Sequence, residues 1–211
     1  MTNTVEQEDL IVLTADANME AAVRGILQQH GKLGIRQVQA NVRRHPQRDP
    51  GCRVAGVEFL APFKNQYSHA LLMFDHEGCG EENTLAVNLE TQLTRALAND
   101  GWDDRAKAIV LVPELEIWVW SDSPHVDAAL GWHGREPNLR QWLVDEHFLI
   151  QGQSKPERPK EAMEAALRLV KKPRSSARYA DLAAKVGFNR CTDQAFVGLK
   201  SILQTWFSDG A

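Results

Sequence analysis

In the stretch His69-Ala-Leu-Leu-Met-Phe-Asp-His-Glu-Gly-Cys-Gly80, a mostly apolar run leads directly into an acidic turn that contains two glycines. A short continuous apolar run bounded by turn residues is typical of a strand buried on both faces of a parallel sheet. Two similar runs, Leu10–Thr14 and Ala108–Val112, occur before and after this stretch. We therefore predict a buried strand at each of the three runs.

The segments between these strands have helical spacing. Apolar residues predict a helix over Met19–His30, with Asn18 as its N-cap and Gly31 as its C-terminal stop. Leucines at every fourth position predict a second helix over Thr84–Asn99. A weak alternation over Gly34–Val42 indicates a further strand. Alternating strands and helices predict an α/β fold with a mostly parallel sheet flanked by helices and right-handed crossovers.

Two regions differ from this alternation. Arg43–Gly51 has the composition of a loop, and Val54–Leu60 is compatible with a short strand or an irregular segment. Beyond Ser121 the sequence predicts only helices, which we place at Val126–Trp132, Asn138–Phe148, Lys160–Val170, Ser176–Val186 and Asp193–Phe207. We interpret residues 1–123 as the α/β domain and residues 124–211 as a helical cap or subdomain packed on it.

Composition limits the class of protein. The chain has 211 residues, and no apolar run approaches the roughly 20 residues that a membrane span needs. The polar, acidic N-terminus does not resemble a signal peptide. Three widely spaced cysteines form neither a disulfide framework nor a CxxC pair. We therefore expect a cytoplasmic protein with reduced thiols and no membrane partner.

Acidic side chains follow each predicted buried strand. Open parallel sheets bind ligands at the carboxyl ends of their strands, where Asp75, Glu77 and Glu116 are expected to meet. Converging carboxylates repel one another unless a cation lies among them, and a site of hard oxygen ligands favours Mg²⁺ or Mn²⁺. We therefore predict that these three residues are metal ligands. The alternative is an ordinary acidic surface turn.

Asp16 and Glu114 have competing interpretations. Asp16 follows the first strand and is a candidate catalytic residue, but an Asp before a helix is also a routine N-cap. If Asn18 caps the helix, Asp16 is free to act in catalysis. Glu114 and Glu116 alternate with apolar residues, so both face either the ligand or the solvent. Of the two, Glu116 is the better candidate for an inward-facing acid.

Basic stretches lie on either side of the acidic segment Asp75–Glu90, although the net charge is −4. This pattern fits a metal centre beside a groove for a polyanion, or else ordinary solvated charges. Lys160 opens a predicted helix, where a cation is unfavourable for the helix dipole. We therefore treat Lys160 as a candidate catalytic residue that neutralises a phosphate, the alternative being a solvated side chain.

These motifs resemble a known family. The strand that leads into Asp75-x-Glu77 and the strand that leads into Glu114-x-Glu116-x-Trp118 resemble Toprim-like proteins of bacterial defence islands, in particular a small component of methylation-associated anti-phage systems. The resemblance extends to the Trp206-Phe207 end. It implies a Toprim fold that binds Mg²⁺ through acidic residues, with an acid/base Glu at the end of the first strand. Here Thr14-Ala15 stands where that family has Glu-Gly.

Two functions follow from the resemblance. The first is a Mg²⁺-dependent nuclease that hydrolyses phosphodiester bonds in anti-phage defence. The second is a non-catalytic Toprim-like subunit that binds nucleic acid or other defence-system proteins. A third interpretation is an α/β protein whose acids are simply solvated.

Overall fold

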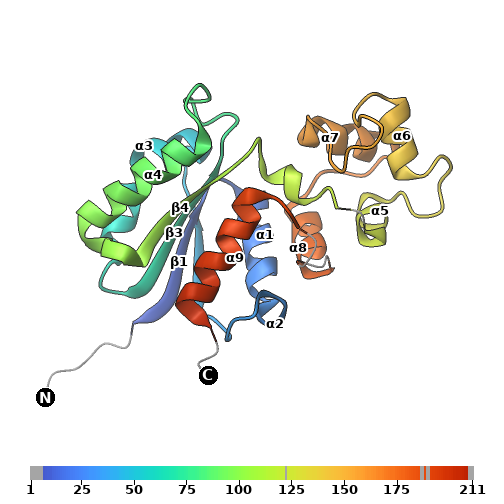
Figure 1. The fold of residues 1–211 in the computed structure, drawn as a ribbon. Coiled ribbons are helices and arrows are strands. Elements are labelled where there is room, and N and C mark those ends of the chain that lie inside the picture. Colours follow the sequence, from blue (N-terminus) through green and yellow to red (C-terminus); the bar gives the residue numbers. More distant parts are fainter. Residues whose placement is uncertain (1–6, 122, 186–187, 189–190, 209–211) are drawn as a thin grey trace, which may run out of the picture.

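A computed structural model describes residues 7–121, 123–185, 188 and 191–208. Four strands form one sheet in the order β2-β1-β3-β4, and every neighbouring pair is parallel (Figure 1). The strands are β1 (Glu8–Thr14), β2 (Ala40–Arg44), β3 (Tyr67–Asp75) and β4 (Ala106–Leu111). The α/β class and the helix-flanked parallel sheet that the sequence predicted are therefore confirmed.

Helices cover both faces of this sheet. α3 and α4 lie on one side, and α1 and α9 lie on the other (Figure 1). The helices are α1 (Ala17–Leu27), α2 (His30–Leu33), α3 (Arg48–Leu60), α4 (Ala86–Leu97), α5 (Pro124–Leu130), α6 (Leu139–Asp145), α7 (Pro159–Leu169), α8 (Ser176–Lys185) and α9 (Gln194–Phe207). Short 3-10 or π turns occupy η1 (Ala61–Phe63), η2 (Ala98–Trp102), η3 (Asp103–Arg105) and η4 (Leu115–Trp118).

The two central strands form the core. Leu10–Leu13 of β1 and Ala70–Phe74 of β3 are fully buried, because helices cover both of their faces. Burying one such side chain contributes about 1.5–3 kcal/mol relative to leaving it exposed. The register pairs Thr14 with Met73 and Asp75 with Leu111, so the carboxyl ends of β1, β3 and β4 reach the same edge of the sheet.

The segment between α2 and β3 differs from the sequence prediction. The predicted strand Gly34–Val42 begins later, at β2, and Val54–Leu60 belongs to helix α3 rather than to a strand or an irregular segment. Glycine weakens a helix. Helix α3 nevertheless contains Gly56, because the helix packs closely on β3. A Cβ at Gly56 would lie 2.7 Å from Cδ1 of Leu72. Tertiary packing therefore requires a glycine at a position where glycine weakens the helical pattern of the sequence.

The ends of the first helix also differ from the prediction. Asp16, not Asn18, is the N-cap of α1, and α1 ends at Leu27. Gly31 lies inside the short helix α2, and the left-handed residue that ends α2 is Gly34, with φ of 72°. The helix is therefore confirmed, but the residues predicted at both of its ends are wrong.

The five C-terminal helices lie within three residues of their predicted ends, and Val186 is outside the described residues. α8 packs so closely on α1 that a Cβ at Gly25 would lie 2.8 Å from Cβ of Ala183. At the C-terminal end of α9, the Trp206 ring stacks on His69 of β3, with 4.5 Å between the ring centroids. The division at residues 123 and 124 stays an interpretation of the sequence. α9 packs on β4 and completes the layer that covers the sheet, whereas α8 packs on α1.

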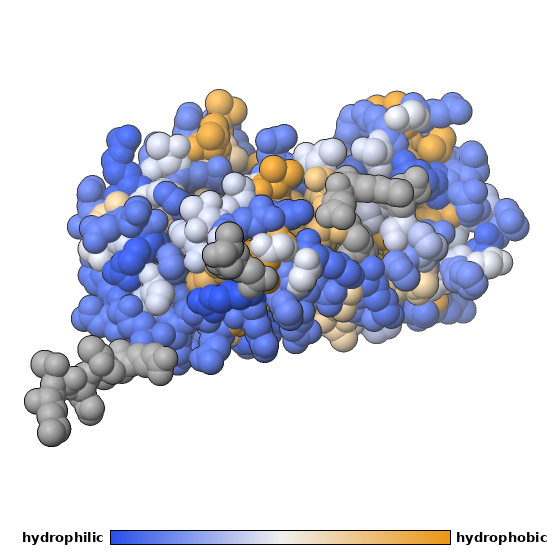
Figure 2. Space-filling model, turned by 60° about the horizontal axis from the view of Figure 1, so that its bottom comes forward, coloured by the Kyte–Doolittle hydropathy of each residue, from blue (hydrophilic) through white to orange (hydrophobic). Residues whose placement is uncertain are grey.

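The surface in Figure 2 is mostly hydrophilic, and its hydrophobic residues form small separate patches. Among the described residues, no helix is both long enough and apolar enough to cross a membrane.

Candidate metal centre

The site is built where β3 and β4 end. Asp75 is the last residue of β3, and the turn after it is fixed against the segment after β4. The backbone N–H of His76 donates to the carbonyl of Leu111 at 2.8 Å, and the backbone N–H of Glu77 donates to the carbonyl of Pro113 at 2.9 Å. The segment after β4 then turns into η4, which places Glu114 and Glu116 beside Asp75.

Three carboxylates meet at this point. Asp75, Glu114 and Glu116 each offer an oxygen, and these oxygens all lie within 4.8 Å of one another. Glu114 is 2% exposed and Glu116 is 1% exposed. The backbone N–H of Leu115 donates to Oδ1 of Asp75 at 2.9 Å, which fixes that carboxyl group. A donor set made only of carboxylates suits a hard divalent cation, so this cluster could hold a metal ion.

Burial and neighbouring charges raise the pKa values of two of the three acids. Burial raises the pKa of Asp75 well above its usual range, and the nearby charges of Asp49 and Glu116 raise it further. Burial likewise raises the pKa of Glu114, and the charge of Glu116 adds to the effect. A cation among the carboxylates would favour the charged forms of Asp75 and Glu114, against the burial and repulsion that raise their pKa values.

Cations of the protein already contact two of the three acids. Lys160, in the first turn of α7, reaches Oε2 of Glu114 with its ammonium at 3.1 Å and Oε1 with its backbone N–H at 3.1 Å. The guanidinium of Arg174 and the hydroxyl of Tyr179 both donate to Oε1 of Glu116. The helical portion of the chain therefore neutralises the two glutamates, while Asp75 has no such ion pair among the described residues.

Asp49 supports the site from the other side. It lies in the first turn of α3, and its Oδ1 accepts the backbone N–H of Asp75 at 2.9 Å. Burial raises the pKa of Asp49. Sequence reasoning missed this residue because it assigned Arg43–Gly51 to a loop. Recognition of the helix that begins at Arg48 would have placed Asp49 near the strand ends.

The structure separates the predicted metal ligands. Asp75 and Glu116 lie in the cluster, Glu114 joins them, and Glu77 is exposed and lies outside the group. The prediction for Glu77 assumed that residues two apart project to the same side. That pattern ends at Asp75, because the chain turns immediately afterwards and Gly78 adopts φ of 84°. The sequence favours Glu116 over Glu114 as the inward-facing acid, and the structure places both in the cluster.

The two predicted catalytic residues have structural partners. Oδ1 of Asp16 accepts the backbone N–H groups of Asn18 and Met19, each at 2.9 Å, which is the geometry of an N-cap. Its charge still contributes to the raised pKa of Asp75. Lys160 forms the ion pair with Glu114 described above. Asp16 therefore lies near the cluster but caps α1, and Lys160 is paired with one acid of the cluster.

Arg174 and Tyr179 carried no signal in the sequence. They lie 58 and 63 residues after Glu116 and reach it only through the packing of the C-terminal helices. Burial raises the pKa of Tyr179, so its hydroxyl remains a proton donor at neutral pH.

A polar hollow of about 720 Å³ opens beside the ends of β1 and β2. Asp16, Arg43, Arg44 and Arg48 are among the residues that line it. Arg44 pairs with Glu20 at 2.9 Å, and the Arg43 guanidinium lies over the ring of Phe63. Basic side chains therefore border the edge of the sheet that carries the acidic cluster.

No protein-family model, curated protein or solved structure matches this chain.

Proposed function

We propose that this protein is a Toprim-like nuclease that hydrolyses phosphodiester bonds with the help of Mg²⁺ or Mn²⁺ and acts in bacterial anti-phage defence. The observation that carries the proposal is the meeting of Asp75, Glu114 and Glu116 within 4.8 Å at the carboxyl edge of the sheet. The resemblance of the strand-end motifs to Toprim-like defence proteins supplies the reaction class and the biological setting.

The three carboxylates are the residues that would hold the cation. A bound divalent cation supplies Lewis-acid stabilisation of phosphate charge and activation of water. Asp75 keeps its orientation through the N–H of Leu115, and Glu116 through Arg174 and Tyr179. Lys160, whose side chain is 42% exposed, is positioned to exchange its contact with Glu114 for one with a substrate phosphate.

The polar hollow beside the ends of β1 and β2 supports a nucleic acid as the substrate, because three arginines line it. Arg43, Arg44 and Arg48 are exposed and border the same edge of the sheet as the acids. Phosphate contacts of this kind hold a nucleic-acid backbone without reading its sequence. We therefore expect cleavage with little sequence preference and with strong dependence on salt.

A second candidate is a non-catalytic subunit that binds nucleic acid or a partner protein. Its support lies at the end of β1, where the family has its acid/base Glu. There Thr14 is buried and donates its hydroxyl to the carbonyl of Arg43 at 3.0 Å. The nearest acid, Asp16, is committed to capping α1. A metal site that lacks this base would bind its ligand without cleaving it.

The test is a cleavage assay with Mn²⁺ and Mg²⁺ on single- and double-stranded DNA and RNA. It compares wild type with Asp75→Asn, which removes a proposed ligand, and with Glu77→Gln, which changes an exposed acid outside the cluster. The nuclease proposal predicts cleavage by wild type and Glu77→Gln and none by Asp75→Asn.

Two other outcomes would reject the nuclease proposal. Metal-dependent binding of nucleic acid without cleavage would establish the non-catalytic subunit instead. Equal cleavage by wild type and Asp75→Asn would trace the activity to a contaminant or to another site.

A further inference from the structure

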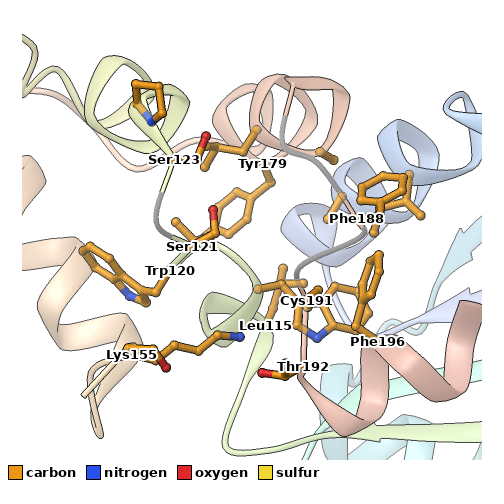
Figure 3. A pocket seen from close by; sticks show the side chains of 18 residues that line it. Leu115, Trp120, Ser121, Ser123, Lys155, Tyr179, Phe188, Cys191, Thr192 and Phe196 are labelled. Carbon is orange, nitrogen blue, oxygen red and sulfur yellow. The ribbon is translucent and has the colours of Figure 1, made fainter. Parts of the chain in front are cut away.

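A second cavity, of about 550 Å³, lies against η4, the same turn that carries Glu116 of the acidic cluster. Its walls come from η4 and the segment after it, from α1 and α8, and from the start of α9. Figure 3 shows Trp120 and Lys155 on one side of the pocket and Phe188 and Phe196 on the other. Its volume falls within the range of sites that bind small molecules.

The walls are mainly apolar and rich in aromatic rings. Trp118, Trp120, Tyr179, Phe188 and Phe196 all line the cavity. The rings of Trp118 and Phe196 meet edge to face at 5.4 Å, and those of Phe188 and Phe196 are tilted at 5.2 Å. Aromatic walls of this kind favour a flat aromatic guest, because offset stacking and edge contacts add to the burial of apolar area.

Among the described residues that line the cavity, Lys155 carries the positive charge. The Lys155 side chain is half-buried and extends toward Leu115 in the pocket (Figure 3). Within the part of the chain that the structure describes, its ammonium has neither a hydrogen bond nor an ion pair. No acidic residue is among the described residues that line the cavity. An ammonium beside apolar walls gains from an anion that shares its partly dry surroundings.

We propose that this pocket binds a small aromatic molecule that carries one anionic group, such as a carboxylate, sulfonate or phosphate. The aromatic body lies among Trp120, Tyr179 and Phe196, and the anion pairs with Lys155. Polar groups at the rim, including Ser123 and Thr192, offer further hydrogen bonds. The pocket shares Tyr179 with the metal centre, because the Tyr179 hydroxyl donates to Glu116, but the proposal depends neither on metal binding nor on the nuclease reaction.

The experiment uses two fluorescent probes with closely similar aromatic bodies. Anilinonaphthalene sulfonate carries one negative charge, and N-phenylnaphthylamine carries none. Each is titrated into the full chain, and fluorescence reports the affinity. Wild type is expected to bind the anionic probe saturably with one probe per chain. Lys155→Met is expected to weaken the anionic probe about tenfold, as the loss of one partly buried charge pair implies. It is expected to leave the neutral probe unchanged.

Three further variants make the result specific. Lys200→Met removes a lysine on α9 that does not line the cavity, and it should bind both probes as wild type does. Lys155→Arg keeps the charge and should retain the anionic probe. Thr192→Trp fills the rim and should weaken both probes. Thermal unfolding of each variant at the wild-type temperature shows that the fold is intact.

The proposal is overturned if Lys155→Met binds the anionic probe as tightly as wild type, or if Thr192→Trp affects neither probe. It is also overturned if wild type shows only unsaturable binding of many probes per chain.

Discussion

Two strand ends that look alike in the sequence differ in the folded protein. Asp16 follows buried strand β1, and Asp75 ends buried strand β3. The carboxylate of Asp16 accepts two backbone N–H groups of the next helix. The carboxyl of Asp75 instead lies in the cluster with Glu114 and Glu116.

The difference follows from what comes next along the chain. A helix begins directly after Asp16, so its unpaired N–H groups are the nearest partners of the carboxylate. After Asp75 the chain makes a turn, and the next helix, α4, begins only at Ala86. The nearest partners of Asp75 therefore come from the segment after β4, which carries two more acids. An acid at a strand end is a candidate ligand only where the backbone N–H groups of the residues that follow it do not bind its carboxylate.

The largest effect on stability is expected from breaking the contact between Arg174 and Glu116. Arg174→Met leaves the carboxylate of Glu116 buried with only the Tyr179 hydroxyl, which should lower the free energy of unfolding by about 3 kcal/mol. Urea unfolding in the absence of metal measures the change. Arg168→Met is the matched control, because Arg168 is exposed in α7 and has no ion pair among the described residues.

A second variant tests the cause of that loss. Adding Glu116→Gln to Arg174→Met should recover most of the stability, because the unpaired charge is gone. A loss below about 1 kcal/mol for Arg174→Met alone would mean that Glu116 finds other partners and that the cluster is less buried than described.

A smaller effect is expected at the end of β1. Asp16→Ala should lower the free energy of unfolding by about 1 kcal/mol, because α1 loses its N-cap. Asp16→Asn should keep most of the stability, since the amide oxygen can still accept the two N–H groups. Neither variant should change metal affinity by more than a few-fold. Loss of metal binding in Asp16→Asn would break the comparison, since both strand ends would then carry ligands.

The smallest effect concerns pH at the opposite edge of the sheet. Burial lowers the pKa of His69, and the charge of Arg105 lowers it further, against the opposing charges of Asp104 and Asp9. As the pH falls, His69 therefore takes up a proton at a higher pH in the unfolded chain than in the folded chain. Stability contributed by this residue is complete above the unfolded pKa of 6.5 and is lost as pH falls through the lower folded pKa.

His69→Phe should retain the ring contact with Trp206 and remove this titration. Between pH 7.5 and pH 5.5, at roughly one pH unit on either side of the ordinary histidine pKa, it should lose less stability than wild type. Burial also lowers the pKa of His45, so some dependence on pH should remain. Identical losses in the two proteins would show that His69 titrates as a solvated histidine.

The sequence predicted what local pattern controls and missed what tertiary contact controls. Continuous apolar runs located β1, β3 and β4, and the residues after them located Asp75 and Glu116. Helix α3 was missed because Pro50 and Gly51 in its first turn favoured a loop, and because Gly56, which packs on Leu72, weakens the helical pattern further along. Glu77 was wrongly grouped with the acids of the cluster, because alternation along a strand does not continue into a turn.

Arg174 and Tyr179 were not predictable for another reason. Their partner Glu116 lies on a distant part of the chain, and no local pattern announces such a contact. They also affect metal binding, because a cation that enters the site would approach glutamates that already have positive or hydrogen-bonding partners. Asp75, which lacks an ion pair among the described residues, is therefore the most sensitive position for a test.

The most direct test of the cluster is a calorimetric titration of Mn²⁺ and Mg²⁺ into wild type, Asp75→Asn and Glu77→Gln. Asparagine keeps the contact with the N–H of Leu115 and removes the charge, so it tests the ligand without breaking the turn. We expect saturable binding to wild type and Glu77→Gln, and affinity at least about a hundredfold weaker in Asp75→Asn, a loss of about 2.7 kcal/mol. No binding to wild type, or equal binding to wild type and Asp75→Asn, would contradict a metal centre at this edge of the sheet.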